Sequence, residues 1–353
     1  MMDLHTFCRG CPMCEVHVHF EGTLEDNQAE LIASRNDIKL TRPRILDMRP
    51  GFQYSSLQDF LDPYYEACSV LLYENDFRDV AYEFLKKQSA GNVRHTDMFF
   101  DPQAHISRTN PRTGRKITFG TVIRGIRKGI KDANRDFGVT CNLVMCILRH
   151  LTEKDALECF AQAVPYLKWI TALGLDSGER GNPPRKFKRV FALARACGLP
   201  VRAHAGEEGP AAYIWQTLKV LKGTIIDHGV ACVDDEALMV YLRDNQIPLT
   251  MCSLSSLRLR VINTLAQYPV GRLLLFGLLV TLNSDDPAYF GGYLKDVLIA
   301  TAEAQNLTIH DIYKLARNSW LASYCTDAQK SAGIADLDDF YKLALTPALT
   351  AVA

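Results

Sequence analysis

The chain has 353 residues, of which 48% are hydrophobic and 23% charged, and its 40 basic side chains balance its 40 acidic ones. This balance excludes the strongly basic surface typical of proteins that bind nucleic acids or anionic membranes, and no apolar run is long enough to span a bilayer. The residues before Cys14 lack the features of a secretion signal, and the eleven cysteines indicate reduced thiols, so we expect a cytoplasmic protein, in a eukaryote also a nuclear one.

Short apolar runs alternate with longer amphipathic stretches along the chain. The runs are rich in Val, Ile, Leu and Phe and predict eight strands buried on both faces, at residues 14–20, 93–100, 140–148, 169–175, 199–203, 224–227, 247–252 and 278–283. The stretches between them, such as 153–167, 186–197 and 234–244, have helical periodicity. This alternation predicts an α/β fold of the (β/α)8 or TIM barrel type. The doubly wound alternative is disfavoured because no glycine-rich phosphate turn follows the first strand.

Two insertions interrupt the alternation. Residues 23–92 lie between the first two predicted strands and contain helical segments at 57–73 and 76–88. A long excursion after a barrel strand typically builds a lid or a wall of the pocket. Residues 101–116 are polar and basic, with Pro and Gly, and predict a loop. We therefore expect a single barrel domain over residues 1–353, with a helical lid insertion at about 23–92.

His17 and His19 lie two residues apart at the end of the first predicted strand. Side chains two apart in a strand point to the same side, which at the carboxyl end of a barrel strand is the mouth of the barrel. Two imidazoles there can hold one divalent ion. The alternative is a pair of buried histidines with structural partners.

Other chemistry-bearing residues follow the fifth, sixth and eighth predicted strands: His204, Glu207, His228, Asp285 and Asp286. Each has a structural alternative when taken alone, such as a helix N-cap before Pro287. A barrel, however, brings the ends of these strands together with His17 and His19. Three imidazoles and a carboxylate suit zinc, with one position left open for water.

Two further patterns are assigned to structure. Cys8, Cys11 and Cys14 have the spacing of a metal or iron–sulfur site, but no suitably placed fourth cysteine follows. The basic segment 108–131 is interpreted as a solvated loop and helix face because acidic residues balance it overall.

Six long segments carry a resemblance to a known family: HVHFEGTL (17–24), FFDPQAH (99–105), GLDSGERGNPPRKF (174–187), IDHGV (226–230), LSSLRLRV (254–261) and NSDDPAYFGGY (283–293). Over nearly its whole length the chain resembles the adenosine/AMP deaminase family of metal-dependent hydrolases, and most of all its adenine deaminase branch. The resemblance implies a TIM barrel enzyme of purine salvage that hydrolyses adenine to hypoxanthine and ammonia.

The resemblance also implies a role for each candidate at the mouth. By this resemblance, the metal ligands would be His17, His19, His204 and Asp285, which would hold one Zn²⁺ per chain. Glu207 would protonate the purine ring at N1. His228 would orient the attacking water and help to remove its proton, and Asp286 would hydrogen-bond the ring at N7.

Substrate preference is expected to depend on two further segments. Ser177, Gly178 and Glu179 resemble the segment that contacts the far edge of the purine. Glu21 stands where adenosine deaminases usually carry an aspartate that meets the ribose, and its extra methylene would occupy the space of a sugar. The alternatives are deamination of adenosine or of an N6-substituted adenine, or an inactive purine-binding sensor. We expect a small-molecule purine as partner, neither nucleic acid nor membrane, and a homo-oligomer, as relatives often are.

Overall fold

The computed structural model describes residues 2–41 and 52–346, and its centre is a barrel of parallel strands. The strands are β1 (Met13–His19), β2 (Val93–Phe100), β3 (Thr140–Leu148), β4 (Ala172–Asp176), β5 (Arg202–Ala205), β6 (Ile225–His228), β7 (Leu249–Met251) and β8 (Val280–Leu282). They form two four-stranded sheets in sequence order. Parallel bridges from Leu173 to Val201 and from Val18 to Asp285 join the sheets and close the ring. The prediction of a (β/α)8 barrel is confirmed.

Strands β4, β5 and β6 begin and end nearer the carboxyl end of the chain than predicted. The fourth run was expected from Trp169, but residues Val164–Trp169 form a 3-10 helix and β4 starts at Ala172. The fifth was expected over 199–203, but β5 starts at Arg202, after Pro200, which cannot donate a hydrogen bond to a neighbouring strand. The shifts extend β4, β5 and β6 to the residues that face the mouth.

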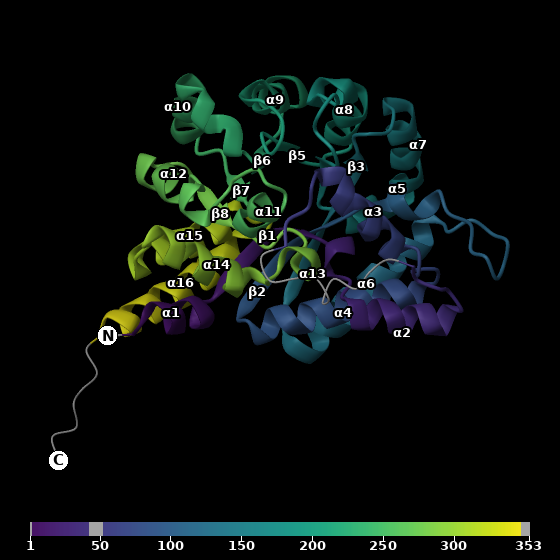
Figure 1. The fold of residues 1–353 in the computed structure, drawn as a ribbon, viewed down its shortest axis with the longest axis horizontal. Coiled ribbons are helices and arrows are strands. Elements are labelled where there is room, and N and C mark those ends of the chain that lie inside the picture. The colour runs from purple at the N-terminus through teal and green to yellow at the C-terminus, as the bar shows by residue number, and fades with distance from the viewer. Residues whose placement is uncertain (1, 42–51, 347–353) are drawn as a thin grey trace, which may run out of the picture.

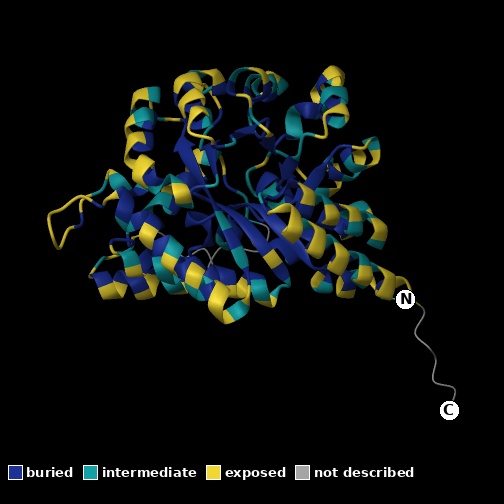
Figure 2. Cartoon of the chain, turned by 180° about the vertical axis from the view of Figure 1, so that it is seen from behind, coloured by how far each residue is buried: buried dark blue, intermediate teal, exposed yellow. Residues whose placement is uncertain are grey.

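Helices surround the barrel, with their exposed faces outward and the strands buried inside (Figures 1 and 2). The helices are α1 (Leu4–Gly10), α2 (Asp26–Asn36), α3 (Leu57–Cys68), α4 (Glu74–Ala90), α5 (Pro102–Ile106), α6 (Phe119–Phe137), α7 (Glu153–Ala163), α8 (Lys188–Ala196), α9 (Ala211–Gln216), α10 (Glu236–Asp244), α11 (Ser253–Arg258), α12 (Val270–Phe276), α13 (Pro287–Phe290), α14 (Leu294–Gln305), α15 (Ile309–Ala322) and α16 (Asp327–Leu345). None of the described helices is long and apolar enough to cross a bilayer.

Helices α4 and α6 show how the outer layer packs. Helix α6 starts at an N-cap, Thr118, whose side chain accepts a hydrogen bond from the backbone of Thr121. Gly125 and Gly129 let α4 approach closely, since a Cβ atom would lie 2.4 Å from the carbonyl of Glu74 and 2.5 Å from that of Arg78, respectively. The missing side chains therefore set the spacing of this helix pair.

The insertion after β1 contains α2, α3 and α4, and α3 ends at Cys68, earlier than the predicted residue 73. The second insertion is only partly a loop. Its first residues form the short helix α5, with Pro102 at the start, where a missing N–H is tolerated. Gln103 and His105 of α5 are buried, and the prediction of a loop over 101–116 is wrong for the helical part.

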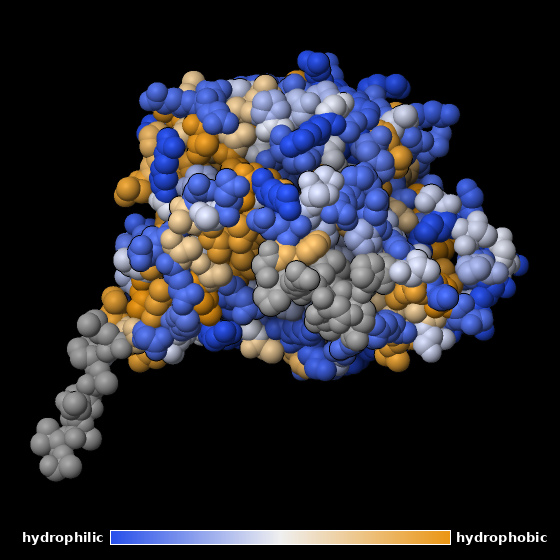
Figure 3. Space-filling view, in the orientation of Figure 1, coloured by the Kyte–Doolittle hydropathy of each residue, from blue (hydrophilic) through white to orange (hydrophobic). Residues whose placement is uncertain are grey.

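The face of the molecule in Figure 3 is mostly hydrophilic, with apolar side chains gathered near α12 and α14.

All eleven cysteines are free thiols, and only Cys197 among them is exposed. Cys8, Cys11 and Cys14 are buried, and the described residues place them in no group of potential metal ligands.

Candidate active site

A small cavity of about 40 Å³ opens where the carboxyl ends of the strands meet. One wall is polar and comes from the strand ends: His19, Asp101, Asp176, Ser177, His204, Glu207, His228, Asp285 and Asp286. The other wall is mainly apolar and aromatic and comes largely from α3: Leu57, Phe60, Leu61, Tyr64 and Tyr65. A helix of the long insertion thus forms the wall opposite the polar groups. An apolar wall with a few converging polar groups is typical of small-molecule sites.

Three residues at the mouth have a left-handed backbone although none of them is glycine. Ser177, His228 and Asp285 have φ angles of 69°, 63° and 64°, and they follow or end β4, β6 and β8. Non-glycine residues in this region are uncommon and tend to mark functional sites. The turns direct these side chains toward the cavity, which a regular strand would not do.

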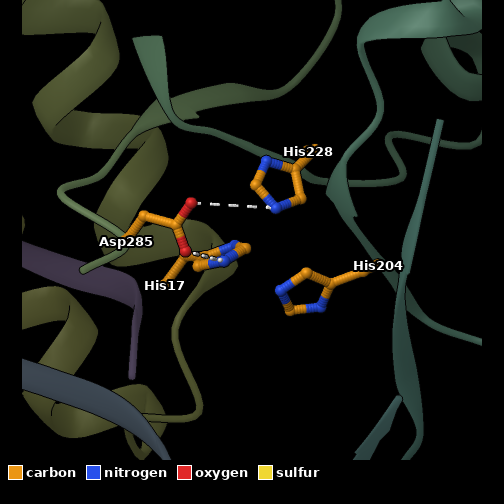
Figure 4. A group of neighbouring side chains, drawn as sticks. All are labelled: His17, His204, His228 and Asp285. Atoms are coloured by element: carbon orange, nitrogen blue, oxygen red, sulfur yellow. Dashed lines mark hydrogen bonds and ion pairs between the residues drawn. The ribbon is translucent and has the colours of Figure 1, made fainter. Parts of the chain in front are cut away.

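Five side chains form a compact imidazole–carboxylate cluster. Figure 4 shows His17, His204, His228 and Asp285 pointing toward one another, and their potential ligand atoms all lie within 4.8 Å. His19 joins them, with its Nε2 3.1 Å from Nε2 of His204 and 3.3 Å from Oδ1 of Asp285. The same Oδ1 lies 3.1 Å from Nε2 of His17.

These separations can be tested against a bound ion. A tetrahedral zinc with bonds of about 2.0–2.1 Å holds its ligand atoms about 3.3 Å apart. The three distances among the ligand atoms of His17, His19, His204 and Asp285 agree with that spacing. His228 stands further out, 3.9 Å from the other oxygen of Asp285 and 3.5 Å from Glu207. The residues present therefore fit a divalent cation, with His228 at its border.

The far sides of the imidazoles are held by a second set of groups. Nδ1 of His17 lies 2.8 Å from the Thr250 hydroxyl, which donates to Asp227. Nδ1 of His19 lies 3.5 Å from Asp176. Such outer partners fix the ring orientation of metal-binding histidines. None of these partners was identified from the sequence, because each comes from a different strand.

Asp227 is held in turn by a fully buried arginine. Nε of Arg202 donates to both carboxylate oxygens of Asp227, at 3.0 and 3.1 Å, and its Nη2 donates to the carbonyl of Val16. Burial disfavours the ionised carboxyl, but the charge of Arg202 outweighs burial and holds the pKa of Asp227 below its usual value. This ion pair ties β1, β5 and β6 together beneath the cluster.

We expect Arg202→Met to lower the free energy of unfolding by about 3–5 kcal/mol, because it leaves the Asp227 carboxylate buried without a counter-charge. Urea denaturation measures the change. The control is Arg135→Met, which removes an exposed arginine from its pairs with Asp132 and Asp136 and should cost no more than about 1 kcal/mol. Equal losses in the two variants would contradict the role of the buried pair.

The loop after β5 carries Glu207 and is clamped by Glu179. Oε1 of Glu179 accepts from the backbone N–H of Gly206 at 2.9 Å, and Oε2 accepts from Glu207 and Glu208 at 3.1 and 3.0 Å and from Gly209. Gly206, at φ 77°, makes the turn. The clamp aims the Glu207 side chain at the cavity.

Arg149, fully buried at the end of β3, completes the clamp. Its Nη1 donates to the carbonyl of His204 at 2.6 Å and lies 3.5 Å from Glu179. One guanidinium therefore links the end of β5 to the carboxylate that holds the next loop.

The two groups expected to move protons have shifted pKa values. Burial, together with the charges of Asp285 and Glu179, raises the pKa of Glu207 well above its usual range, which favours the protonated carboxyl. Burial lowers the pKa of His228 to about 3, so its imidazole is neutral. Nε2 of His228 lies 3.5 Å from Oε2 of Glu207. The cavity thus holds a proton donor and a proton acceptor next to the cluster.

Asp286 lines the cavity because Gly22 leaves room for it. A Cβ atom at Gly22 would lie 1.9 Å from Oδ1 of Asp286. Burial raises the pKa of Asp286 well above its usual range. The loop is anchored by the buried Glu15, which accepts from the backbone and hydroxyl of Ser284 at 2.8 and 2.5 Å. Glu15 precedes His17 on β1, but its partner Ser284 follows β8, so its anchoring role appears only in the folded barrel.

The structure places Glu21, Gly178 and Glu179, which were expected to contact substrate, outside the lining of the cavity. Ser177 lines the cavity as expected, whereas Gly178 lines an adjoining groove and Glu179 forms the clamp described above. Glu21 is fully buried behind the cavity wall, where its Oε1 accepts from the Asp101 backbone at 3.0 Å and contacts His105 at 2.8 Å. These partners hold the Glu21 side chain outside the cavity lining.

Comparison with known proteins identifies what this arrangement resembles. The sequence model of the adenosine deaminase family matches residues 12–340. An adenine deaminase of Hahella chejuensis is 44% identical over 337 residues, which are 96% of this chain and 99% of that protein. The crystal structure of an adenine deaminase from Arthrobacter aurescens aligns with a TM-score of 0.89 at 39% identity, covering 94% of this chain and 100% of that one. An amidohydrolase from Burkholderia ambifaria with bound zinc has a TM-score of 0.87 at 24% identity, over 96% of this chain and 93% of that one, and shares the fold.

Proposed function

The chain belongs to the adenosine deaminase family, and from that premise we propose that it is a zinc-dependent enzyme that hydrolyses adenine to hypoxanthine and ammonia. Relatives that are 44–45% identical over nearly the whole chain are adenine deaminases and support this reaction. The observation that carries the proposal in the structure is the position of a buried Glu207, whose pKa is raised, beside the imidazole–carboxylate cluster.

One zinc ion per chain, held by His17, His19, His204 and Asp285, is the cofactor we propose. Support comes from their mutual distances and from the zinc bound in the Burkholderia amidohydrolase. When bound, zinc lowers the pKa of a coordinated water toward about 7 and so supplies the nucleophile.

The remaining chemistry belongs to side chains of this chain. C6 of adenine is a poor electrophile until N1 gains a proton, which the neutral Glu207 can donate. His228, a neutral imidazole next to Glu207, can accept the proton of the attacking water. Asp286 can donate to N7 and so orient the ring. The aromatic side chains of α3 cover the base and limit the entry of bulk water.

We further propose that residues 1–353 form one barrel domain whose insertion, through α3, acts as the lid of the cavity. Five side chains of α3 in the cavity wall support this. We also propose that the protein acts in purine salvage, is located in the cytoplasm and forms a homo-oligomer. Sedimentation velocity of the purified chain tests whether it forms an oligomer.

Ammonia release by the zinc-loaded protein tests the function, with adenine, adenosine, AMP and an N6-alkyl adenine compared side by side. Dominant turnover of adenine is expected. Faster turnover of another purine would show that this purine, and not adenine, is the preferred substrate of the same deamination reaction. Full zinc occupancy without ammonia release from any of them would support the purine-sensor alternative.

A further inference from the structure

Asp101 is a cavity residue without a task in the chemistry above. It follows β2 directly and occupies the N-cap position of α5, yet its side chain makes no capping hydrogen bond. Its backbone N–H donates to Glu21, which fixes the position of the residue. The Asp101 carboxyl is 3% exposed and lines the cavity.

One oxygen of this buried carboxyl is unpaired. Among the described residues, Oδ1 of Asp101 has no hydrogen-bond partner. An unsatisfied buried acceptor costs on the order of 1–3 kcal/mol, more if it is charged. Such a cost in a cavity wall is offset when a bound ligand donates a hydrogen to that oxygen.

Asp101 and Glu207 line the cavity beside different groups. Potential ligand atoms of Asp101, His19 and Asp176 lie within 4.8 Å of one another, whereas Glu207 lies 3.5 Å from Nε2 of His228. If Glu207 meets N1, beside the reacting C6, then Asp101 faces the opposite edge of the base. In free adenine that imidazole edge carries an N–H at N9, and in a nucleoside N9 carries the sugar.

We propose that Oδ1 of Asp101 accepts a hydrogen bond from N9–H of free adenine and thereby selects the free base over its nucleoside. The inference rests on the proposed function. Adenosine is rejected twice, because it has no hydrogen to offer and because its sugar meets the Asp101 carboxyl. Glu21 then acts from behind as a positioning residue, holding the backbone of Asp101 instead of blocking the sugar with its own side chain.

The test compares adenine with 9-methyladenine, which loses the N–H but adds only a methyl group. The ratio of their kcat/KM values is measured for the wild type and for Asp101→Ala. We expect the ratio to fall about 10- to 100-fold in the variant, the effect of one hydrogen bond to a charged or polar buried group. General damage to the site would lower both values and leave the ratio unchanged, so each substrate is the control for the other.

Asp101→Leu, which has a similar size but no hydrogen-bond acceptor, provides a second variant and should lower the ratio in the same direction. An unchanged ratio in both variants would overturn the proposal. So would loss of bound metal, since His19, Asp101 and Asp176 could also hold a cation. If the wild type releases no ammonia from adenine, the proposed function fails, and the relative binding of hypoxanthine and 9-methylhypoxanthine to wild type and variant still decides the role of Asp101.

Discussion

Glu207→Gln is expected to lower kcat about 10²- to 10⁴-fold, the usual contribution of a positioned general acid. Glutamine has the size of glutamate but no acidic proton to transfer to N1. The backbone of residue 207 is held by Glu179, so the loop should keep its shape in the variant. Bound zinc and the affinity for hypoxanthine are expected to stay within about twofold of wild type. Steady-state kinetics and elemental analysis measure these quantities.

The matched control for this change is Glu208→Gln, one residue further along. Glu208 carries the same group but lines the adjoining groove near Arg180 and not the cavity, so its variant should keep most of the activity. Near-normal turnover in Glu207→Gln would remove this residue from its role as the acid.

The pH dependence of the wild type follows from the same group. Glu207 must be protonated to act, and burial raises its pKa. Activity should therefore persist through neutral pH, where an ordinary glutamate is ionised, and fall as the pH rises through the raised pKa. A kcat/KM profile measures this limb. In Glu207→Gln the limb should be absent from the residual activity; its persistence would assign it to another group.

His19→Ala is expected to remove zinc and activity together. Its Nε2 lies within 3.3 Å of ligand atoms of both His204 and Asp285, so its loss opens one corner of the cluster. Loss of an outer partner of a metal ligand typically costs 10- to 100-fold in metal affinity, and loss of a ligand should cost more. Zinc content after dialysis, measured by elemental analysis, reports the effect.

His150→Ala is the comparison for the metal measurement. His150 lies near the same mouth, with its Nδ1 2.8 Å from the Ser177 hydroxyl, but outside the cluster. This variant should retain one zinc per chain. Stoichiometric zinc in His19→Ala would show that His19 is not a ligand.

Much of the fold was predictable because its causes are local. A strand buried on both faces is a continuous apolar run, whereas a surface helix alternates apolar and polar residues. This difference can be read from the sequence alone, so all eight strands were located. Their ends were less certain. A 3-10 helix at Val164–Trp169 and the proline before β5 moved two strand starts by three residues. The short helix α5 was missed because its buried side chains lie in a polar, proline-containing segment.

The sequence by itself determined which residues stand at strand ends, because the hydrophobic period and the barrel rule depend only on the order of residues along the chain. It therefore located the histidines, Glu207 and Asp285. Tertiary structure alone decided what surrounds them. Glu15 holds the loop after β8, Glu179 holds the loop after β5, and Asp101 rather than Glu21 faces the cavity. Each of these contacts joins segments far apart in sequence, so its geometry depends on how the closed ring places one strand end beside another.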